Sequence, residues 1–349
     1  MTLPFPHEEH PDLGSTAQRL EPLILPKGVK ATPVFHTYWF FAAERQRIFF
    51  ERLNNRKYPW TQDPILATHK FTNAYRASDR VSQYLINKVI YSGDQNPIEL
   101  VFRILLFKFF NKIETWELLE RQLGCLSYQN FDFSSFDRVL TQALEEKKRI
   151  YSAAYIMPTG GVTDRKHRTH LRLLETMMKN SLPQRLQNMN SLREVFELLR
   201  AYPTIGDFLA YQYAIDLNYS CFLNFSEMEF IVPGPGATDG IRKCFRDAGN
   251  LLPSDLIRFV AETQQEQFQK LQINFQNLWG RPLQLIDCQN LFCEVDKYAR
   301  YAHPEIKGKT GRTRIKQKFR PNMSKLEYFY PPKWSINNLI GSTTKACTA

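Results

Sequence analysis

Bulky apolar side chains recur at helical spacing along most of the chain. From Val34 to about residue 303 they return every three or four positions among charged residues, the pattern of helices that bury one face. Only SEMEFIV, residues 226–232, alternates as a strand does, and no repeat of solenoid period occurs. The pattern predicts a mainly α protein, a compact array of many helices. It is clearest at residues 38–53, 80–91, 99–113, 135–155, 170–186, 191–202, 206–217 and 254–272.

The two ends of the chain have a different composition. Residues 1–33 contain six prolines and no sustained period, so we expect a flexible leader. Residues 304–349 begin with seven Lys or Arg between Lys307 and Arg320, which indicates a basic, poorly ordered arm. The helical domain is therefore predicted to cover residues 34–303.

The charge balance indicates a polyanion as partner. The 349 residues carry 46 Lys and Arg against 35 Asp and Glu, a formal net charge of +11. Nucleic acid is the commonest such partner, and an anionic membrane surface comes second. No apolar run approaches the roughly 18–20 residues that span a bilayer, and the N-terminus lacks a signal-peptide pattern. We expect a nuclear protein, or a cytoplasmic one if the source is prokaryotic or viral.

Three motifs suggest cofactors without fitting them. The GKT at 308–310 lacks the P-loop glycine, because His303 stands in its place. The glycines of GPGATDG, residues 234–240, are spaced one residue too far apart for a dinucleotide fingerprint. His167 and His170 are three apart in a basic segment, which favours a phosphate contact or a solvated helix start over a metal site. We therefore expect neither a metal nor a nucleotide cofactor.

A hairpin between two predicted helices offers a grip on a phosphate backbone. In AYPTIGDF a helix ends near Tyr202 and a second one opens at Asp207. This resembles the helix-hairpin-helix element of DNA glycosylases, in which backbone N–H groups, here near Thr204 and Gly206, meet a DNA phosphate. In that superfamily a catalytic carboxylate follows the hairpin glycine by about twenty residues, and counting on reaches Glu227.

Six segments in order carry a wider resemblance. They are residues 71–86, 102–119, 153–160, 202–219, 225–245 and 293–301. Together they are similar to a DNA-base hypermodification family, the α-glutamyl/putrescinyl thymine pyrophosphorylases and the helical domain of hydroxymethyl-deoxyuridine DNA kinases. The resemblance covers residues 35 to about 303.

This resemblance implies a glycosylase-like helical fold that acts on DNA. Relatives work on hydroxymethyluracil: a kinase phosphorylates the hydroxymethyl group, and pyrophosphorylase-type members displace that leaving group with an amine nitrogen. It implies DNA as partner, an amine or amino acid as co-substrate, and a separate DNA-base kinase or a thymine-oxidising dioxygenase beside the chain. Because the P-loop is missing, the chain is expected to act as a displacing transferase or beside such a kinase. The target base must leave the stack to be reached.

The resembling segments supply candidate site residues. Tyr75 is a candidate for base stacking, Arg76 and Arg80 for phosphate binding, and Asp79 for orienting an arginine or taking a proton. A buried structural pair of Arg and Asp is the alternative. Arg103 and Asn111 interrupt an apolar helix, either at its edge or in a polar pocket, and we favour the pocket for Arg103.

The later segments add acids, a lysine and a glycine turn. Asp216 lies where the dipole of the hairpin's second helix disfavours a carboxylate, so either function or a salt bridge must compensate it. Glu294 and Lys297 face the same way and could bind the amine donor, although a surface ion pair is simpler. The turn that follows Glu227 is expected to approach DNA with a helix opening near Thr238. Its candidate backbone contacts are Gly234, Gly236, Arg242 and Lys243.

Two other functions remain open at this point. A DNA glycosylase would use Glu227 to stabilise positive charge on the sugar and would leave an abasic product. A non-catalytic DNA reader would bind DNA in a salt-sensitive way, and its binding would survive replacement of Glu227 and Asp79.

Overall fold

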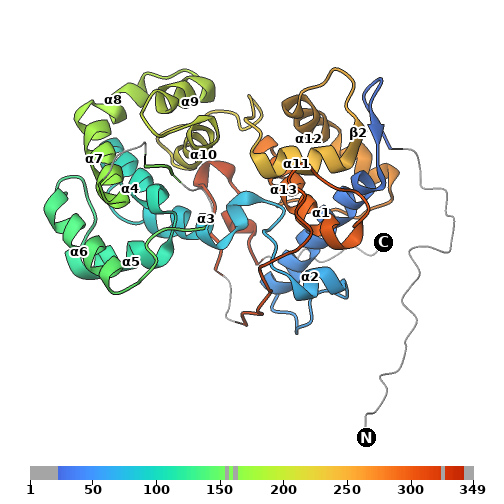
Figure 1. Ribbon diagram of the computed structural model, residues 1–349, viewed down its shortest axis with the longest axis horizontal. Helices are drawn as coiled ribbons and strands as arrows, with labels where there is room; N and C mark the ends of the chain where they lie inside the picture. The colour runs from blue at the N-terminus through green and yellow to red at the C-terminus, as the bar shows by residue number, and fades with distance from the viewer. Residues whose placement is uncertain (1–22, 154–156, 160–163, 324–326, 342–349) are drawn as a thin grey trace, which may run out of the picture.

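The computed structural model describes residues 23–153, 157–159, 164–323 and 327–341, and most of them are helical. The prediction of a mainly α fold is confirmed. Figure 1 shows the helices in two groups. One group contains α3 (Arg80–Tyr84), α4 (Pro97–Phe110), α5 (Ile113–Leu123), α6 (Phe133–Glu145), α7 (Lys166–Lys179), α8 (Leu182–Gln187), α9 (Leu192–Arg200) and α10 (Asp207–Asn218). The other contains α1 (Pro33–Leu53), α2 (Pro64–Thr68), α11 (Pro235–Cys244), α12 (Pro253–Lys270) and α13 (Leu285–Ala302).

Two short strands and four short helical elements complete the fold of the described residues. The strands β1 (Lys30–Ala31) and β2 (Phe245–Asp247) pair antiparallel, with Ala31 opposite Phe245. The remaining short elements are η1 (Arg76–Ser78), the π-helix η2 (Leu85–Ile90), η3 (Pro332–Trp334) and η4 (Asn337–Leu339).

Aromatic packing holds α1 in the second group. Thr32 caps the helix by accepting a hydrogen bond from the Val34 N–H at 3.2 Å, and Pro33 fits the first turn. Trp39 meets Phe268 of α12 edge to face at 5.0 Å, and it is fully buried. The apolar face that the sequence predicts for residues 38–53 is therefore the face of α1 that packs in this core.

Glycines allow α11 to lie directly against α13. A Cβ atom on Gly240 would lie 1.9 Å from the carbonyl oxygen of Phe292, so a side chain there cannot be accommodated. A Cβ atom on Gly236 would lie 2.5 Å from the Sγ atom of Cys293. The glycine-rich turn thus serves close helix packing, and α11 begins at Pro235 rather than near Thr238 as expected.

The expected strand at residues 226–232 does not form. Its alternation has another cause: Phe230 and Ile231 are buried, while the Glu229 carboxylate accepts hydrogen bonds from Leu192 N at 2.8 Å and Arg193 N at 3.1 Å. This carboxylate caps the start of α9, where unpaired N–H groups favour an anion. The segment is a loop held by a helix cap.

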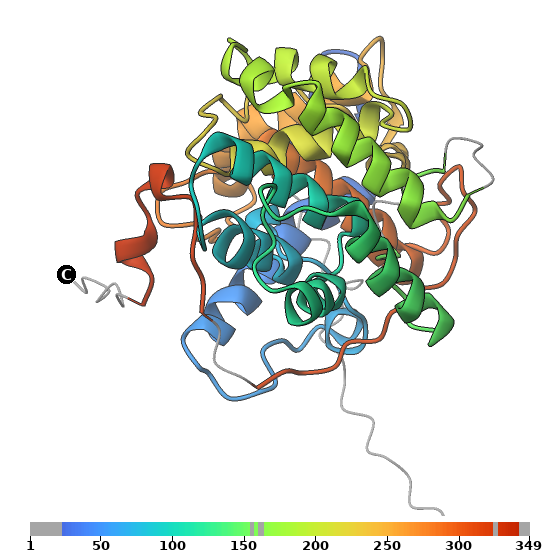
Figure 2. The ribbon, with the colours of Figure 1, turned by 90° about the vertical axis from the view of Figure 1, so that its left-hand side faces the viewer.

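The described parts of both ends lie on the helical body. Val29 is buried in the core, and Ile24 bonds with the side chain of Gln267, whereas residues 1–22 of the expected leader lie outside the described residues. In the C-terminal segment Tyr330 is fully buried and Ile336 nearly so. The expectation of a poorly ordered arm is thus wrong for this aromatic part, because its apolar side chains are buried. Figure 2 shows the segment, in red, at one side of the molecule.

Candidate functional site

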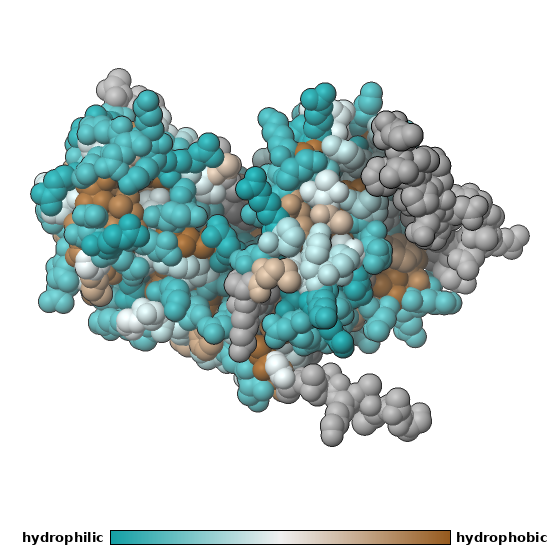
Figure 3. All heavy atoms as spheres, turned by 90° about the horizontal axis from the view of Figure 1, so that it is seen from below, coloured by the Kyte–Doolittle hydropathy of each residue, from teal (hydrophilic) through white to brown (hydrophobic). Residues whose placement is uncertain are grey.

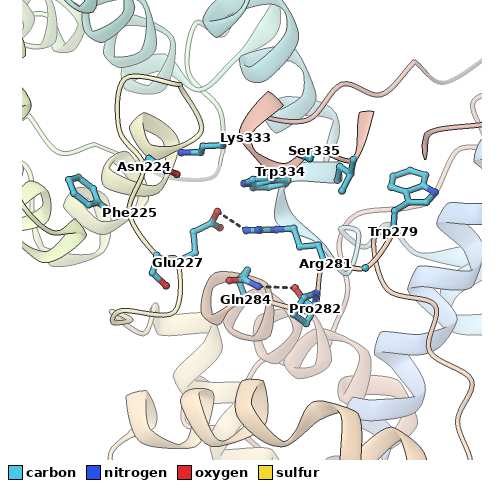
Figure 4. Close-up of a pocket in the computed structure, with 13 residues that line it drawn as sticks. Asn224, Phe225, Glu227, Trp279, Arg281, Pro282, Gln284, Lys333, Trp334 and Ser335 are labelled. Carbon is cyan, nitrogen blue, oxygen red and sulfur yellow. Dashed lines mark hydrogen bonds and ion pairs between the residues drawn. The ribbon is translucent and has the colours of Figure 1, made fainter. Parts of the chain in front are cut away.

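A polar pocket of about 560 Å³ opens where three distant parts of the chain meet. We call it the Glu227 pocket. Figure 4 shows Glu227 reaching toward Arg281, with Lys333 and Trp334 on the opposite wall. The lining residues are Asn224, Phe225, Ser226, Glu227, Trp279, Gly280, Arg281, Pro282, Gln284, Lys333, Trp334, Ser335 and Ile336.

Hydrogen bonds hold the two loops that carry Glu227 and Arg281. The side chain of Asn218 accepts from Phe225 N at 2.9 Å and donates to Phe225 O at 3.0 Å, which fixes the first loop at the end of α10. The Tyr75 hydroxyl donates to Arg281 O at 2.6 Å and accepts from Leu278 N at 3.1 Å. Tyr75 is buried, so it positions the Arg281 loop and offers no face for base stacking.

Lys333 forms the third wall from the C-terminal segment. Its ammonium donates to the carbonyls of Leu223 at 2.6 Å and Ser220 at 3.3 Å, and to that of Asn218. Carbonyls at the end of a helix favour a cation there. Burial lowers the pKa of Lys333 to about 8, so the protonated, charged form of this side chain predominates at neutral pH.

The charges in the Glu227 pocket face one another across a short distance. Arg281 Nη2 lies 2.7 Å from Glu227 Oε1, and the carboxylate side chain is 5% exposed against 19% for the arginine. The guanidinium lies 3.8 Å above the ring of Trp334, a cation–π contact. With Lys333 the pocket holds two cations and one carboxylate among the described residues, so it suits a ligand with negative charge.

A second, smaller cavity of about 80 Å³ lies beside the start of α13. We call it the Gln212 cavity. Gln284, just before α13, lines the Glu227 pocket, and Ile286 in the first turn of α13 lines this cavity. The lining residues are Arg76, Phe208, Gln212, Gly234, Pro235, Gly236, Ala237, Ile286, Gln289, Asn290 and Cys293.

A buried ion cluster lies behind the Gln212 cavity. Arg76 binds Asp216 with two nitrogens, at 2.8 and 3.1 Å, and Lys108 Nζ lies 3.1 Å from the same carboxylate. Burial opposes the charge on Asp216, but Arg76 and Lys108 outweigh it and keep the carboxyl pKa below its ordinary value. A salt bridge therefore compensates the charge of Asp216. Because Asp216 is fully buried, we assign it a structural role.

Two arginines among the candidate site residues, Arg80 and Arg103, lie outside both cavities. Arg80 is 67% exposed and pairs weakly with Glu114 at 3.9 Å. Arg103 is buried and donates to the carbonyls of Val89 at 3.0 Å and Asp94 at 2.6 Å. The preference for a pocket at Arg103 is wrong, because backbone carbonyls already take up its donors. Asn111 ends α4 with φ 48° and accepts from Lys108 at 2.8 Å, so it supports the ion cluster.

Asp79, Glu294 and Lys297 form another polar group, in which Glu294 is buried and the other two are partly exposed. Asp79 accepts from Asn73 N at 2.8 Å, and burial raises its pKa to about 7. Glu294 accepts from Thr72 N at 2.9 Å and pairs with Lys297 at 2.7 Å, so the simpler account, an ion pair, describes it. None of these three lines the Glu227 pocket, so the structure does not bring Asp79 and Glu227 into one site.

The candidate contacts to a DNA backbone divide into accessible and buried groups. A turn joins α9 to α10, with Gly206 preceding α10 and Thr204 at φ 67°. Gly234 and Gly236 line the Gln212 cavity. Arg242 is exposed, as a backbone contact requires. Lys243 is not, because it lies 2.9 Å from Asp296 with its side chain 2% exposed.

Sequence reasoning missed four side chains that define the cavities: Gln212, Arg281, Lys333 and Trp334. Gln212 lies in a segment noted for its hairpin, and Arg281 follows the turn Trp279–Gly280, which could have marked an ordered loop. Lys333 and Trp334 lie in the C-terminal segment, which the sequence predicts to be a poorly ordered arm. Among the described residues no group of three His, Cys, Asp or Glu could hold a metal ion.

Fold and site together define a helical protein with a charged pocket where three separate parts of the chain meet. A model of the family described as 5-hmdU DNA kinase, helical domain, matches residues 32–308, and the chain belongs to this family. A curated relative, the 5-hmdU DNA kinase of Bacillus phage SP10, is 26% identical over 331 residues, which cover 87% of this chain and 50% of the phage protein. The chain therefore spans about half the length of that relative.

No solved structure matches the chain. The expected likeness to the helix-hairpin-helix glycosylase fold therefore stays a prediction. Within the part of the chain that the structure describes, no helix is both long and apolar enough to cross a membrane.

Proposed function

We propose that this chain modifies hydroxymethyluracil in DNA, and that the Glu227 pocket holds the flipped-out nucleotide while its base substituent is exchanged. The observation that carries the proposal is the ion pair of Glu227 with Arg281 in a pocket that also contains Lys333. Cations that face an open pocket suit a phosphorylated substituent, and aromatic rings beside them suit a base.

Family membership supports the substrate class. The phage relative is named for a kinase that acts on 5-hydroxymethyl-deoxyuridine in DNA. The GKT at 308–310 lacks the P-loop glycine, so we propose that a separate kinase activity supplies the phosphorylated base and that this chain consumes it. A thymine-oxidising dioxygenase would make the hydroxymethyl group beforehand. A bacteriophage relative lends no support to a nuclear location.

The proposed reaction is displacement at the methylene carbon of the base. The nitrogen of a neutral amine forms the new C–N bond, and the C–O bond to phosphate or pyrophosphate breaks with its electron pair leaving on the oxygen. Glu227 accepts the proton that the amine loses, since a carboxylate at hydrogen-bond distance can act as a base. Arg281 and Lys333 stabilise the charge on the departing phosphate.

Exposed cations offer the contact with the DNA backbone. The seven Lys and Arg from 307 to 320 are all exposed on the described C-terminal segment, and the hairpin with Thr204 and Gly206 offers N–H groups at a helix start. On the face in Figure 3 hydrophilic residues dominate, and hydrophobic ones form only small patches. We propose that these cations bind phosphates without reading sequence.

The test uses DNA that carries phosphorylated hydroxymethyluracil, a panel of amines, and nucleoside mass spectrometry. We expect a new aminated nucleoside, and Glu227→Gln should lower its rate by about 100-fold or more because the proton acceptor is lost. The matched control is Glu266→Gln, an exposed carboxylate on α12, which should keep the wild-type rate.

Two results would contradict the proposal. An abasic product would identify a glycosylase. Salt-sensitive DNA binding without any product, unaffected by Glu227→Gln, would identify a reader of DNA.

A further inference from the structure

We propose that residues 307–320, together with the exposed Tyr58 and Tyr301 beside them, form a surface that binds an unpaired DNA strand. We call residues 307–320 the basic strap. The inference rests on the proposed function, since DNA is the partner assigned there, and it adds that the bound strand is single. Three features carry it: the strap is fixed on the helical body, its cations are not neutralised, and aromatic rings lie exposed beside it.

The GKT turn fixes the start of the basic strap on α11. The carboxylate of Asp239 accepts hydrogen bonds from Lys309 N at 2.6 Å and from Thr310 N at 3.2 Å. A Cβ atom on Gly308 would lie 2.7 Å from this carboxylate, so the glycine lets the turn close on it. The motif that fits no P-loop therefore serves as an anchor for the basic strap.

The second half of the basic strap lies along the chain that follows α2. Lys318 is opposite His69 in an antiparallel bridge, and Phe319 N donates to Thr68 O at 2.9 Å. Ile315 is 5% exposed and Phe319 is partly buried, which leaves the alternate positions 316, 318 and 320 facing solvent. The strap therefore presents its cations from a fixed backbone.

The cations of the basic strap are not neutralised. All seven are exposed, and none of them forms an ion pair with another described residue. Other exposed cations do pair, such as Arg47 with Glu44 at 2.6 Å and Lys179 with Glu175 at 2.7 Å. The seven are Lys307, Lys309, Arg312, Arg314, Lys316, Lys318 and Arg320. Because like charges on a fixed backbone repel one another, a polyanion that binds them relieves this repulsion.

Two exposed tyrosines lie beside the second half of the basic strap. Tyr301 on α13 is 47% exposed, and its ring centroid is 4.9 Å from that of His69, which forms the bridge to the strap. Tyr58 is 42% exposed, and its ring meets Trp60 edge to face at 5.3 Å. Trp60 in turn lies 6.4 Å from the ring of Phe319 in the strap. Exposed aromatic rings beside cations are the combination that binds single-stranded nucleic acid.

This combination favours an unpaired strand over a duplex. Both forms of DNA offer phosphates, so the cations alone do not distinguish them. Neighbouring bases cover the base faces in a duplex, whereas an unpaired strand can stack its bases on tyrosine rings. An unpaired strand also has its target base free of the complementary strand, as the proposed exchange requires.

Fluorescence anisotropy of the full chain with unmodified DNA tests the proposal, with a labelled single strand and the duplex of the same sequence. We expect the single strand to bind several-fold more tightly than the duplex. Tyr301→Ala should weaken single-strand binding by about tenfold, because one stacked base is lost, whereas Tyr301→Phe should keep the affinity because the ring remains. The matched control is Leu144→Ala, which removes an exposed apolar side chain from α6 and should bind like the wild type.

The salt dependence of binding tests the contribution of the basic strap. Lys318→Gln should weaken single-strand binding and lower the slope of log affinity against log salt concentration by about 0.7, the value for one phosphate contact to a single strand. The control is Lys179→Gln on α7, whose side chain is 66% exposed, and it should leave the slope unchanged.

Four results would overturn the proposal. They are equal or tighter binding of the duplex, wild-type binding by Tyr301→Ala, the same loss in Tyr301→Phe as in Tyr301→Ala, and an unchanged salt slope in Lys318→Gln. Tighter binding of an RNA strand with the same sequence would also overturn it and assign the surface to RNA. These assays use unmodified DNA and follow no reaction, so failure here and failure of the proposed exchange are distinguishable.

Discussion

The Glu227 pocket and the Gln212 cavity flank the start of α13 and are built in opposite ways. In the Glu227 pocket, charged side chains face the opening: Arg281 pairs with Glu227 at 2.7 Å and remains 19% exposed. In the Gln212 cavity, the charges of Arg76 and Asp216 are paired beneath the wall, and an amide and backbone N–H groups face the space. The difference teaches that paired charges at an opening are available for chemistry, whereas a fully buried cluster supports the fold.

The largest expected effect comes from breaking the buried cluster. Asp216→Asn leaves Arg76 and Lys108 buried without their carboxylate. We expect the free energy of unfolding to fall by about 3–5 kcal/mol, because an uncompensated buried charge is strongly disfavoured. Urea unfolding followed by circular dichroism measures it.

The control lies on the same helix. Asp207 is 62% exposed and pairs with Arg200 at the surface, so Asp207→Asn should cost less than about 1 kcal/mol. Equal losses for the two variants would contradict the distinction between buried and open charges.

A smaller effect is expected from the cation of the Glu227 pocket. Lys333→Met should weaken binding of DNA with phosphorylated hydroxymethyluracil by about tenfold at neutral pH, because the pocket loses one of its two positive charges. Because the pKa of Lys333 is lowered to about 8, the wild-type affinity should fall further as pH rises through 8. Lys333→Met should lack that step.

Fluorescence anisotropy across the pH range provides this comparison. The control, Lys57→Met, removes an exposed lysine and should keep the step near pH 8. A step that persists in Lys333→Met would assign it to another group.

A third effect, spread over the pH range, concerns Asp287 in the first turn of α13. Its carboxylate accepts from Arg76 N at 2.7 Å and Gln284 N at 3.0 Å, and burial raises its pKa to about 7. A raised carboxyl pKa means that the native state binds more protons than the unfolded state from about pH 4 to 7. The stability that Asp287 contributes is thus present at low pH and is lost as pH rises through 7.

We expect Asp287→Asn to flatten this loss by about 1 kcal/mol per pH unit between pH 4 and 7, because one pKa unit corresponds to about 1.4 kcal/mol. Thermal unfolding at a series of pH values measures the slope. Asp255→Asn is the matched control, because this residue also caps its own helix, α12, through Leu252 N, but is exposed. The same flattening in both variants would argue against a special role of burial at Asp287.

The helices could be predicted from sequence because their apolar faces follow the period of the α-helix. Residues 38–53 and 206–217 both became helices, since each pattern records a local requirement to bury one side. The strand expected at 226–232 failed because alternation there reflects two buried residues and a helix-capping Glu229. Periodicity alone does not distinguish these cases.

The site could be predicted only in part. Counting from the hairpin reached Glu227, which does line the large pocket. Arg76 and Asp216 were selected for their chemical type, but tertiary packing pairs them out of reach of solvent. Arg281 and Lys333 lie 54 and more than one hundred positions after Glu227, so only the fold brings them together. The spacing of residues along the sequence therefore does not predict this site.

The most direct test of the central claim measures where a modified nucleotide protects the chain. Hydrogen–deuterium exchange should be compared for free protein, protein with thymine-containing DNA, and protein with DNA that carries phosphorylated hydroxymethyluracil. We predict that the modified DNA slows exchange in residues 224–227, 279–284 and 333–336 beyond the effect of thymine DNA, because these segments line the Glu227 pocket. Equal protection by both DNAs in all three segments would contradict the assignment of this pocket to the modified nucleotide.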